Sequence, residues 1–162
     1  MAAVFQGRYT AEVGDGGVTV FLIGMRFNRW WRVDKWWPVF TAMPRMLRHL
    51  AADPESGLLG YHLWIGRTVL VLQYWRDAEH LIRFASDPHA PHAVAWREFN
   101  RRVGAGGHVG IWHETYEVAP GRHEAVYANM PRFGLAAATR HVPVGPGRGS
   151  ARARLRRAAD AA

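Results

Sequence analysis

The sequence predicts an α+β fold, a ferredoxin-like domain that pairs with a second copy as a dimeric α+β barrel. First, its segments follow the order strand, helix, strand, strand, helix pair, strand, strand, which contains two split βαβ units. Second, 162 residues of which 49% are hydrophobic suit one globular domain with one core. Third, such a sheet carries helices on one face, so its other face needs a partner such as a second copy.

The first predicted strand and helix adjoin each other. The β-branched, apolar run Val18 to Phe27 lacks helical periodicity and is typical of a buried strand, within which Gly24 indicates a bulge or a close approach by another group. From Asn28, apolar residues recur every three or four positions, which predicts a helix that ends at Asp53-Pro54. We expect Pro38 and Pro44 to break or kink this helix.

A hairpin and two helices follow. Leu58 to Trp64 and Thr68 to Trp75 are strand-like runs around Gly66-Arg67, a tight-turn composition. Asp77 is a favourable N-cap for a helix that runs to Ser86. Pro91 opens the next helix, which the glycines of 104–107 end.

Two more strands complete the predicted domain. They are Val109 to Val118 and Glu124 to Asn129, joined by a turn at 119–121. We therefore divide the chain into an N-terminal arm (1–16), the ferredoxin-like domain (17–141) and a basic tail (142–162). The tail is rich in Gly, Pro, Ala and Arg, a composition that orders on a partner more readily than on its own.

Composition narrows the possible partners. The net charge is +8, but residues 145–162 hold five arginines against one aspartate, so half of the excess lies in the tail. This distribution argues against a nucleic-acid partner. The longest apolar run is too short to span a membrane, and residues 1–13 do not have the pattern of a secretory signal. These features predict a cytoplasmic protein with no membrane partner. The absence of cysteine excludes thiolate sites.

Two histidines are the candidates for chemistry. His92 lies at the start of an apolar-aromatic helix, and His113 lies in an aromatic strand beyond the glycine loop. Neutral imidazole is a good iron ligand and can also move a proton at neutral pH. His89 is the competing ligand candidate, although Asp-Pro-His-Ala-Pro is typical of an exposed loop. No HExxH motif or carboxylate cluster indicates zinc or non-haem iron.

Several motifs resemble a known family. From Phe21 to about Leu155, the segments FLIGMRFNRWWRVDKWWPVF, QYWRDAEHLIRFA, GIWHETYEV and YANMPRFGL are similar to a bacterial monooxygenase-like family of unknown function in the dimeric α+β barrel superfamily. The resemblance implies a homodimer that acts on a small molecule.

A shorter segment resembles a second family. HAPHAVAW followed by IWHE is similar to the haem-dependent aldoxime dehydratases, although Trp112 stands where that family tends to have tyrosine. This resemblance implies that His92 is the axial ligand of haem b and that His113 is the distal acid/base. For such a haem-dependent mechanism we expect Trp96, Trp112 and the tryptophan-rich helix to wall the cofactor pocket.

Three functions therefore remain open. The first is a haem-dependent enzyme that oxygenates a small organic molecule or dehydrates an aldoxime. The second is a cofactor-independent monooxygenase of the antibiotic-biosynthesis type, in which the substrate supplies the electrons and His113 is the base. The third is a non-catalytic protein that binds a small ligand or haem.

Overall fold

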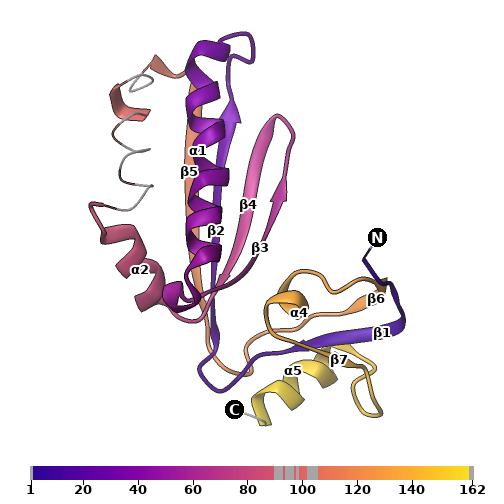
Figure 1. Ribbon diagram of the computed structural model, residues 1–162. Helices are drawn as coiled ribbons and strands as arrows, with labels where there is room; N and C mark the ends of the chain where they lie inside the picture. Colours follow the sequence, from indigo (N-terminus) through magenta and orange to yellow (C-terminus); the bar gives the residue numbers. More distant parts are fainter. Residues whose placement is uncertain (1, 90–92, 94–96, 98, 102–105, 161–162) are drawn as a thin grey trace.

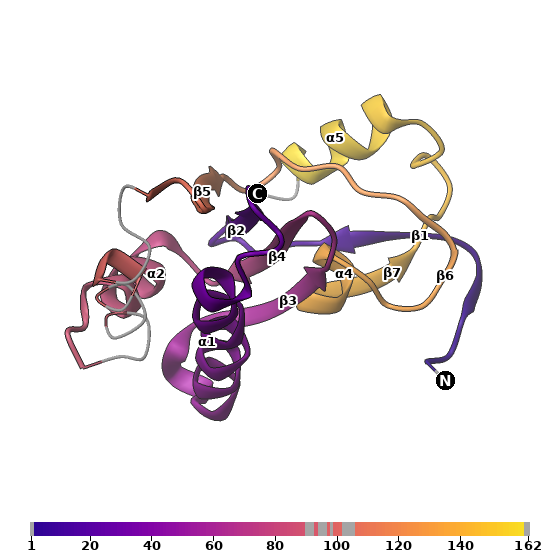
Figure 2. The ribbon, with the colours of Figure 1, turned by 90° about the horizontal axis from the view of Figure 1, so that it is seen from above.

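The computed structural model describes residues 2–89, 93, 97, 99–101 and 106–160. Its larger sheet has four antiparallel strands in the order β3-β4-β2-β5. These strands are β2 (Val18–Phe27), β3 (Leu58–Trp64), β4 (Thr68–Trp75) and β5 (Val109–Val118), with the same bounds as predicted. Helices α1 (Val33–Ala52) and α2 (Ala78–Ser86) lie on one side of it (Figures 1 and 2). The ferredoxin-like α+β plan is confirmed.

The central strand β2 carries apolar side chains on both faces. Met25 on the α1 face is buried with Val69 and Val109, against Phe40 of the helix. On the same face, Trp75 is fully buried with Leu50 of α1 and Leu81 of α2. Since side chains alternate along a strand, the intervening residues of β2 face away from α1.

Helix α1 runs unbroken through Pro38 and Pro44, so the predicted break is wrong. Each proline removes one amide donor from the helix ladder. Thr41 Oγ1 adds local hydrogen bonds of 3.0 Å to Trp37 O and 3.3 Å to Pro38 O. Burial of the apolar helix face on the sheet, including Leu47 and Leu50 at 3% exposure each, offsets the local cost.

Both ends of the chain form a second sheet, of strand order β6-β1-β7. Its elements are β1 (Phe5–Glu12), β6 (Tyr127–Met130) and β7 (Arg140–Pro143), with helices α4 (Leu135–Ala138) and α5 (Ala151–Asp160) beside it. The segment expected as an arm thus contains a paired strand. The strand expected at 124–129 begins later and pairs with β1 instead of with the larger sheet.

Ion pairs hold the C-terminal segment on this second sheet. Arg148 Nη1 lies 2.8 Å from Glu12 Oε1 of β1, and Arg154 Nε donates to Glu124 Oε1 at 2.6 Å. The Arg154 side chain is only 9% exposed, so its contact is better shielded from solvent than an ordinary surface pair. The tail, which we expected to order on a partner, is ordered on its own chain.

The two sheets meet on the face of the larger sheet that α1 does not cover. Their shared core contains Ala11, Val18, Tyr74, Leu135 and Ala136. Burial here raises the pKa of Tyr74 to about 12. Nearby, the backbone N–H of Gly134 donates to His62 Nε2 at 2.8 Å. Burial lowers the pKa of His62, so the neutral form that accepts this bond is favoured.

The predicted N-cap of α2 yields a test of stability. Asp77 Oδ1 accepts from the His80 amide at 2.8 Å and lies 2.7 Å from His80 Nδ1, and these hydrogen bonds lower the pKa of Asp77. We expect Asp77→Ala to reduce the free energy of unfolding by about 1 kcal/mol in urea titrations at neutral pH. Asp77→Asn, which keeps a capping oxygen, is the control.

The lowered pKa also fixes the pH dependence of this difference. The stabilisation by Asp77 is present above the carboxyl pKa of the unfolded chain and is lost as the pH falls through the lower folded value. The gap between wild type and Asp77→Ala should therefore narrow on acidification. A gap that stays constant down to acidic pH would contradict the ionised cap.

Candidate functional site

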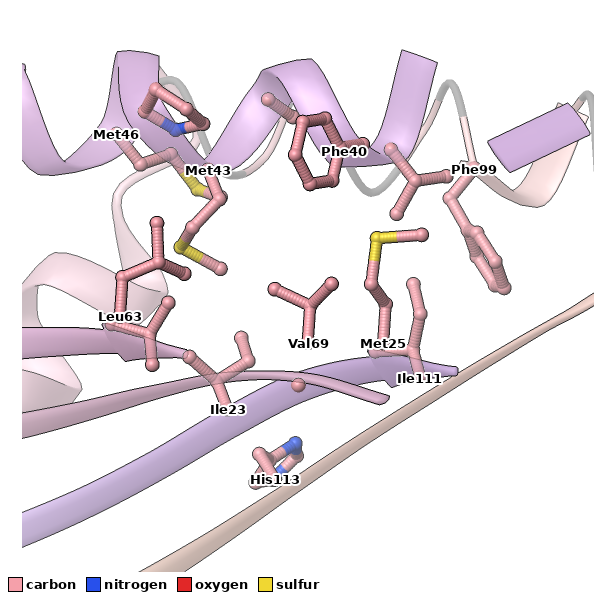
Figure 3. A pocket seen from close by; sticks show the side chains of 15 residues that line it. Ile23, Met25, Phe40, Met43, Met46, Leu63, Val69, Phe99, Ile111 and His113 are labelled. Carbon is pink, nitrogen blue, oxygen red and sulfur yellow. The ribbon is translucent and has the colours of Figure 1, made fainter. Parts of the chain in front are cut away.

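An apolar pocket of about 280 Å³ lies between α1 and the larger sheet. Figure 3 shows Phe40, Met43 and Met46 of α1 on one side and Ile23, Met25 and Val69 of the sheet on the other. The described lining residues are Ile23, Gly24, Met25, Val39, Phe40, Ala42, Met43, Pro44, Met46, Leu63, Val69, Val71, Phe99, Ile111 and His113. A concave site of this size and composition suits a lipophilic small molecule.

His113 is the one titratable side chain among the described lining residues. It lies on β5 opposite Ile23 of β2, and its ring centroid is 5.8 Å from that of Phe21. The residue is exposed to solvent, which gives the imidazole an exchange path for protons. An imidazole at the edge of an apolar cavity can take a proton from a bound molecule and pass it to water.

Trp112 lies on the opposite face of the sheet from His113. It pairs with Gly24 of β2, and a Cβ atom built on Gly24 would lie 2.6 Å from the indole Nε1 of Trp112. This packing confirms the close approach that Gly24 indicated. Trp112 is not among the described lining residues, so the structure does not bring it together with His113 in one pocket wall.

His92 and Trp96 lie outside the described residues. Phe99, which follows them in the chain, does line the pocket. His89 is described: its side chain is exposed, and its backbone N–H donates to Asp87 Oδ1 at 2.8 Å in a turn. His89 is not among the described lining residues.

The tryptophans just before α1 and in its first turns are largely turned away from the pocket. Trp36 packs on Phe27 with ring centroids 4.9 Å apart, whereas Trp30, Trp31 and Trp37 are 72%, 61% and 54% exposed. The helix wall is instead made by Phe40, Ala42, Met43 and Met46, which we had not singled out as site residues. Their spacing of three and four along a helix was the available signal.

A second hollow, of about 470 Å³, lies where α1 ends, beside the short turn η1 (Pro54–Ser56) and α2. Its polar groups mostly serve the local backbone. Asp53 Oδ1 accepts from the Glu55 amide at 2.9 Å, and Ser56 Oγ donates to Leu50 O at 3.0 Å. Within the described part of the chain, no group of three or more His, Asp or Glu could hold a metal ion.

The curated protein "Monooxygenase af470" of Aspergillus fumigatus is 31% identical over 157 residues, covering 80% of this chain and 53% of its own length. The chain thus spans about half the length of that relative.

Two solved structures resemble this chain at low identity, and the first of them shares its fold. An aldoxime dehydratase in complex with butyraldoxime matches 93% of this chain and 43% of its own, with 17% identity and a TM-score of 0.58. SnoaB, a cofactor-independent oxygenase from Streptomyces nogalater, matches 63% of this chain and 93% of its own, with 16% identity and a TM-score of 0.44.

The family profile described as monooxygenase af470-like matches residues 18–135, which hold the whole larger sheet, α1 and the pocket. The resemblance noted in the sequence is confirmed at this level. The chain belongs to the monooxygenase af470-like family.

Proposed function

We propose that this protein is a monooxygenase that oxidises a lipophilic small molecule in the α1 pocket, with His113 as the acid/base group. The observation that carries the proposal is an apolar cavity whose described lining contains a single titratable side chain, an imidazole. Membership of a monooxygenase-like family supports the reaction class. The apolar lining supports a hydrophobic, weakly charged substrate.

The reaction that best suits this lining needs no bound cofactor. A phenolic substrate with an activated ring CH₂ group gives up a proton to His113 and becomes an electron-rich carbanion. Oxidation of the CH₂ to a carbonyl then takes one atom of O₂ into the product and releases the other as water. The substrate supplies all four electrons, so no external reductant is required.

The apolar pocket assists this reaction because it keeps water away from the bound substrate. A phenolate or carbanion in an apolar cavity is poorly solvated, and a protonated imidazole beside it is then a stronger electrostatic partner than in bulk water. His113 lies at the solvent-open edge, so the proton that it accepts can leave without crossing the apolar floor. These two properties together support acid/base chemistry at this position.

A haem-dependent reaction is the second candidate. If residues 91–103 are helical as the sequence predicts, His92 and Phe99 lie seven positions apart and share a helix face. Phe99 lines the pocket. In this candidate function His92 would hold the iron of haem b, and Trp96 would belong to the wall of the cofactor pocket. Bound haem would supply an iron centre for oxygenation or aldoxime dehydration.

The described lining fits a porphyrin only in part. Its apolar walls suit the macrocycle, and His113 suits a distal acid/base group. It contains no arginine or lysine that could pair with the propionates. For this reason we rank the cofactor-independent reaction first, and binding of a ligand without turnover third.

Replacement of His113 tests the first proposal. With a hydroxylated anthrone as the substrate, we expect His113→Ala to lower the rate of oxygen consumption by roughly 10²- to 10⁴-fold, the usual contribution of a positioned acid/base group. His49→Ala is the matched control, because His49 is an exposed histidine on α1 outside the pocket. Equal rates for His113→Ala and wild type would remove His113 from the mechanism. No turnover by wild type would instead favour a binding protein.

An absorption spectrum separates the haem candidate from the other two. Protein produced with added haem precursor should show no stoichiometric Soret band if the cofactor-independent reaction is correct. A Soret band that shifts with dithionite and carbon monoxide, and that His92→Ala abolishes or shifts, would instead establish the haem-dependent candidate.

We also propose that the protein is a homodimer formed through the face of the larger sheet that α1 leaves open. The second sheet covers only part of this face, and Trp64 and Tyr116 on it remain 41% and 53% exposed. A second copy could cover the remaining apolar area.

Sedimentation velocity tests this assembly. We expect wild type to sediment as a dimer and the double variant Trp64→Glu/Tyr116→Glu as a folded monomer, because two carboxylates would be buried at the interface. Tyr61→Glu, on the other face of β3, is the control and should remain dimeric. A monomeric wild type would contradict the proposal.

A further inference from the structure

One end of the molecule exposes large apolar side chains from two separate segments. Figure 1 shows the β2–α1 connection and the β3–β4 turn together at the end of the larger sheet that lies away from the second sheet. A hydrogen bond of 3.0 Å from Phe27 N to Arg67 O joins the two segments. We call this surface the tryptophan tip: its exposed apolar residues are Trp30, Trp31, Val33, Trp37 and Ile65.

The exposures at this tip are unusually high for such residues. Trp30 is 72% exposed, Trp31 61% and Ile65 67%. Tryptophan in a soluble protein is normally largely buried, and a group of exposed apolar side chains marks an interaction surface. The backbone here is fixed, since Trp36 Nε1 donates to Trp30 O at 2.8 Å and Arg32 N donates to Arg29 O at 3.0 Å.

Basic residues surround the tip. Arg26, Arg29, Arg32, Lys35 and Arg67 lie in the two segments against the single acid Asp34, a net charge of +4 for residues 26–35 and 65–67. Arg32 is paired with Asp34 at 2.8 Å. The positive charge affects the neighbouring residue His108. Burial is the largest cause of its lowered pKa, and the charges of Arg32, Arg29 and Lys35 lower the pKa further.

We propose that the tryptophan tip attaches the protein to the surface of an anionic lipid bilayer. Indole rings favour the level of the lipid headgroups, where their apolar body and polar N–H are both accommodated. Arginine and lysine around them complement anionic headgroups. A protein partner would need to be both apolar and acidic at the same place, whereas an anionic bilayer presents an apolar interior beneath acidic headgroups.

This attachment requires no spanning segment. In the part of the chain that the structure describes, no helix is long and apolar enough to cross a membrane. The sequence led us to expect no membrane partner on that same ground, but it does not reveal which tryptophans are exposed. A lipid-bound tip would also lie close to the pocket, since Trp37 stacks on the pocket residue Phe40 with ring centroids 6.1 Å apart.

Vesicle flotation tests the proposal without any substrate, so its result is independent of the proposed enzymatic function. We expect the full chain to float with vesicles of phosphatidylcholine mixed with phosphatidylglycerol, and to bind much less to phosphatidylcholine alone. Trp30→Ser/Trp31→Ser should lower binding by at least about tenfold. Arg29→Gln/Arg67→Gln should lower it by roughly fivefold per residue, most strongly at low salt.

The matched control is Ile82→Ser, which removes an exposed apolar side chain, 54% accessible, from α2 at the opposite end of the larger sheet. This variant should bind vesicles as wild type does. Circular dichroism of each variant checks the fold, which the exposed positions should leave unchanged.

Three outcomes would overturn the proposal. The first is wild type that stays in the lipid-free fraction with anionic vesicles, and the second is a Trp30→Ser/Trp31→Ser variant that floats as well as wild type. The third is wild type that self-associates in solution through the tip, without vesicle binding, and loses this association in the double variant. That last result would assign the tip to a second copy of the chain.

Discussion

The strand β2 must bury both of its faces, and most of the structure follows from this constraint. It is central in the larger sheet, paired with β4 on one side and β5 on the other. Helix α1 covers the face that carries Met25, and the second sheet covers the Val18 end of the opposite face. Because the chain ends build that second sheet, segments of poor core-forming composition become part of the fold.

The pocket is a by-product of the same packing. α1 contacts the sheet through long side chains such as Met43 and Phe40 instead of through small ones, which leaves a space between the two layers. Methionine and phenylalanine line that space without supplying polar groups. A single imidazole from the neighbouring strand then determines which chemistry the pocket can support, since no described neighbour in the lining competes with it for a proton.

Strand and helix periodicity made much of the fold predictable. The four strands of the larger sheet and the cap at Asp77 were identified because alternation and capping are local properties of the sequence. The continuity of α1 through Pro38 was not predicted, because it depends on burial of the apolar helix face against strands that are distant in the sequence. Likewise, β1 is mostly polar, and only its partners β6 and β7, more than a hundred residues away, make it a strand.

The candidate site, like the fold, could be predicted from the sequence only in part. His113 in a strand beside an apolar helix could be found from the sequence, and the structure places it at the pocket. Its neighbour Trp112 was expected there as well, although the alternation that turns Glu114 away from His113 also turns Trp112 away. The exposure of Trp30 and Trp31 could not be read from spacing, since helical spacing is the same for buried and exposed faces.

The three methionines of the pocket have a consequence for an enzyme that handles oxygen. Met25, Met43 and Met46 present thioethers to the same cavity in which the proposed reaction takes place. Thioethers are readily oxidised to sulfoxides, which are polar and no longer pack as methionine does. Each such oxidation would place a polar group in the apolar wall beside the substrate. The loss of activity would therefore depend on the number of turnovers completed and not on the time elapsed.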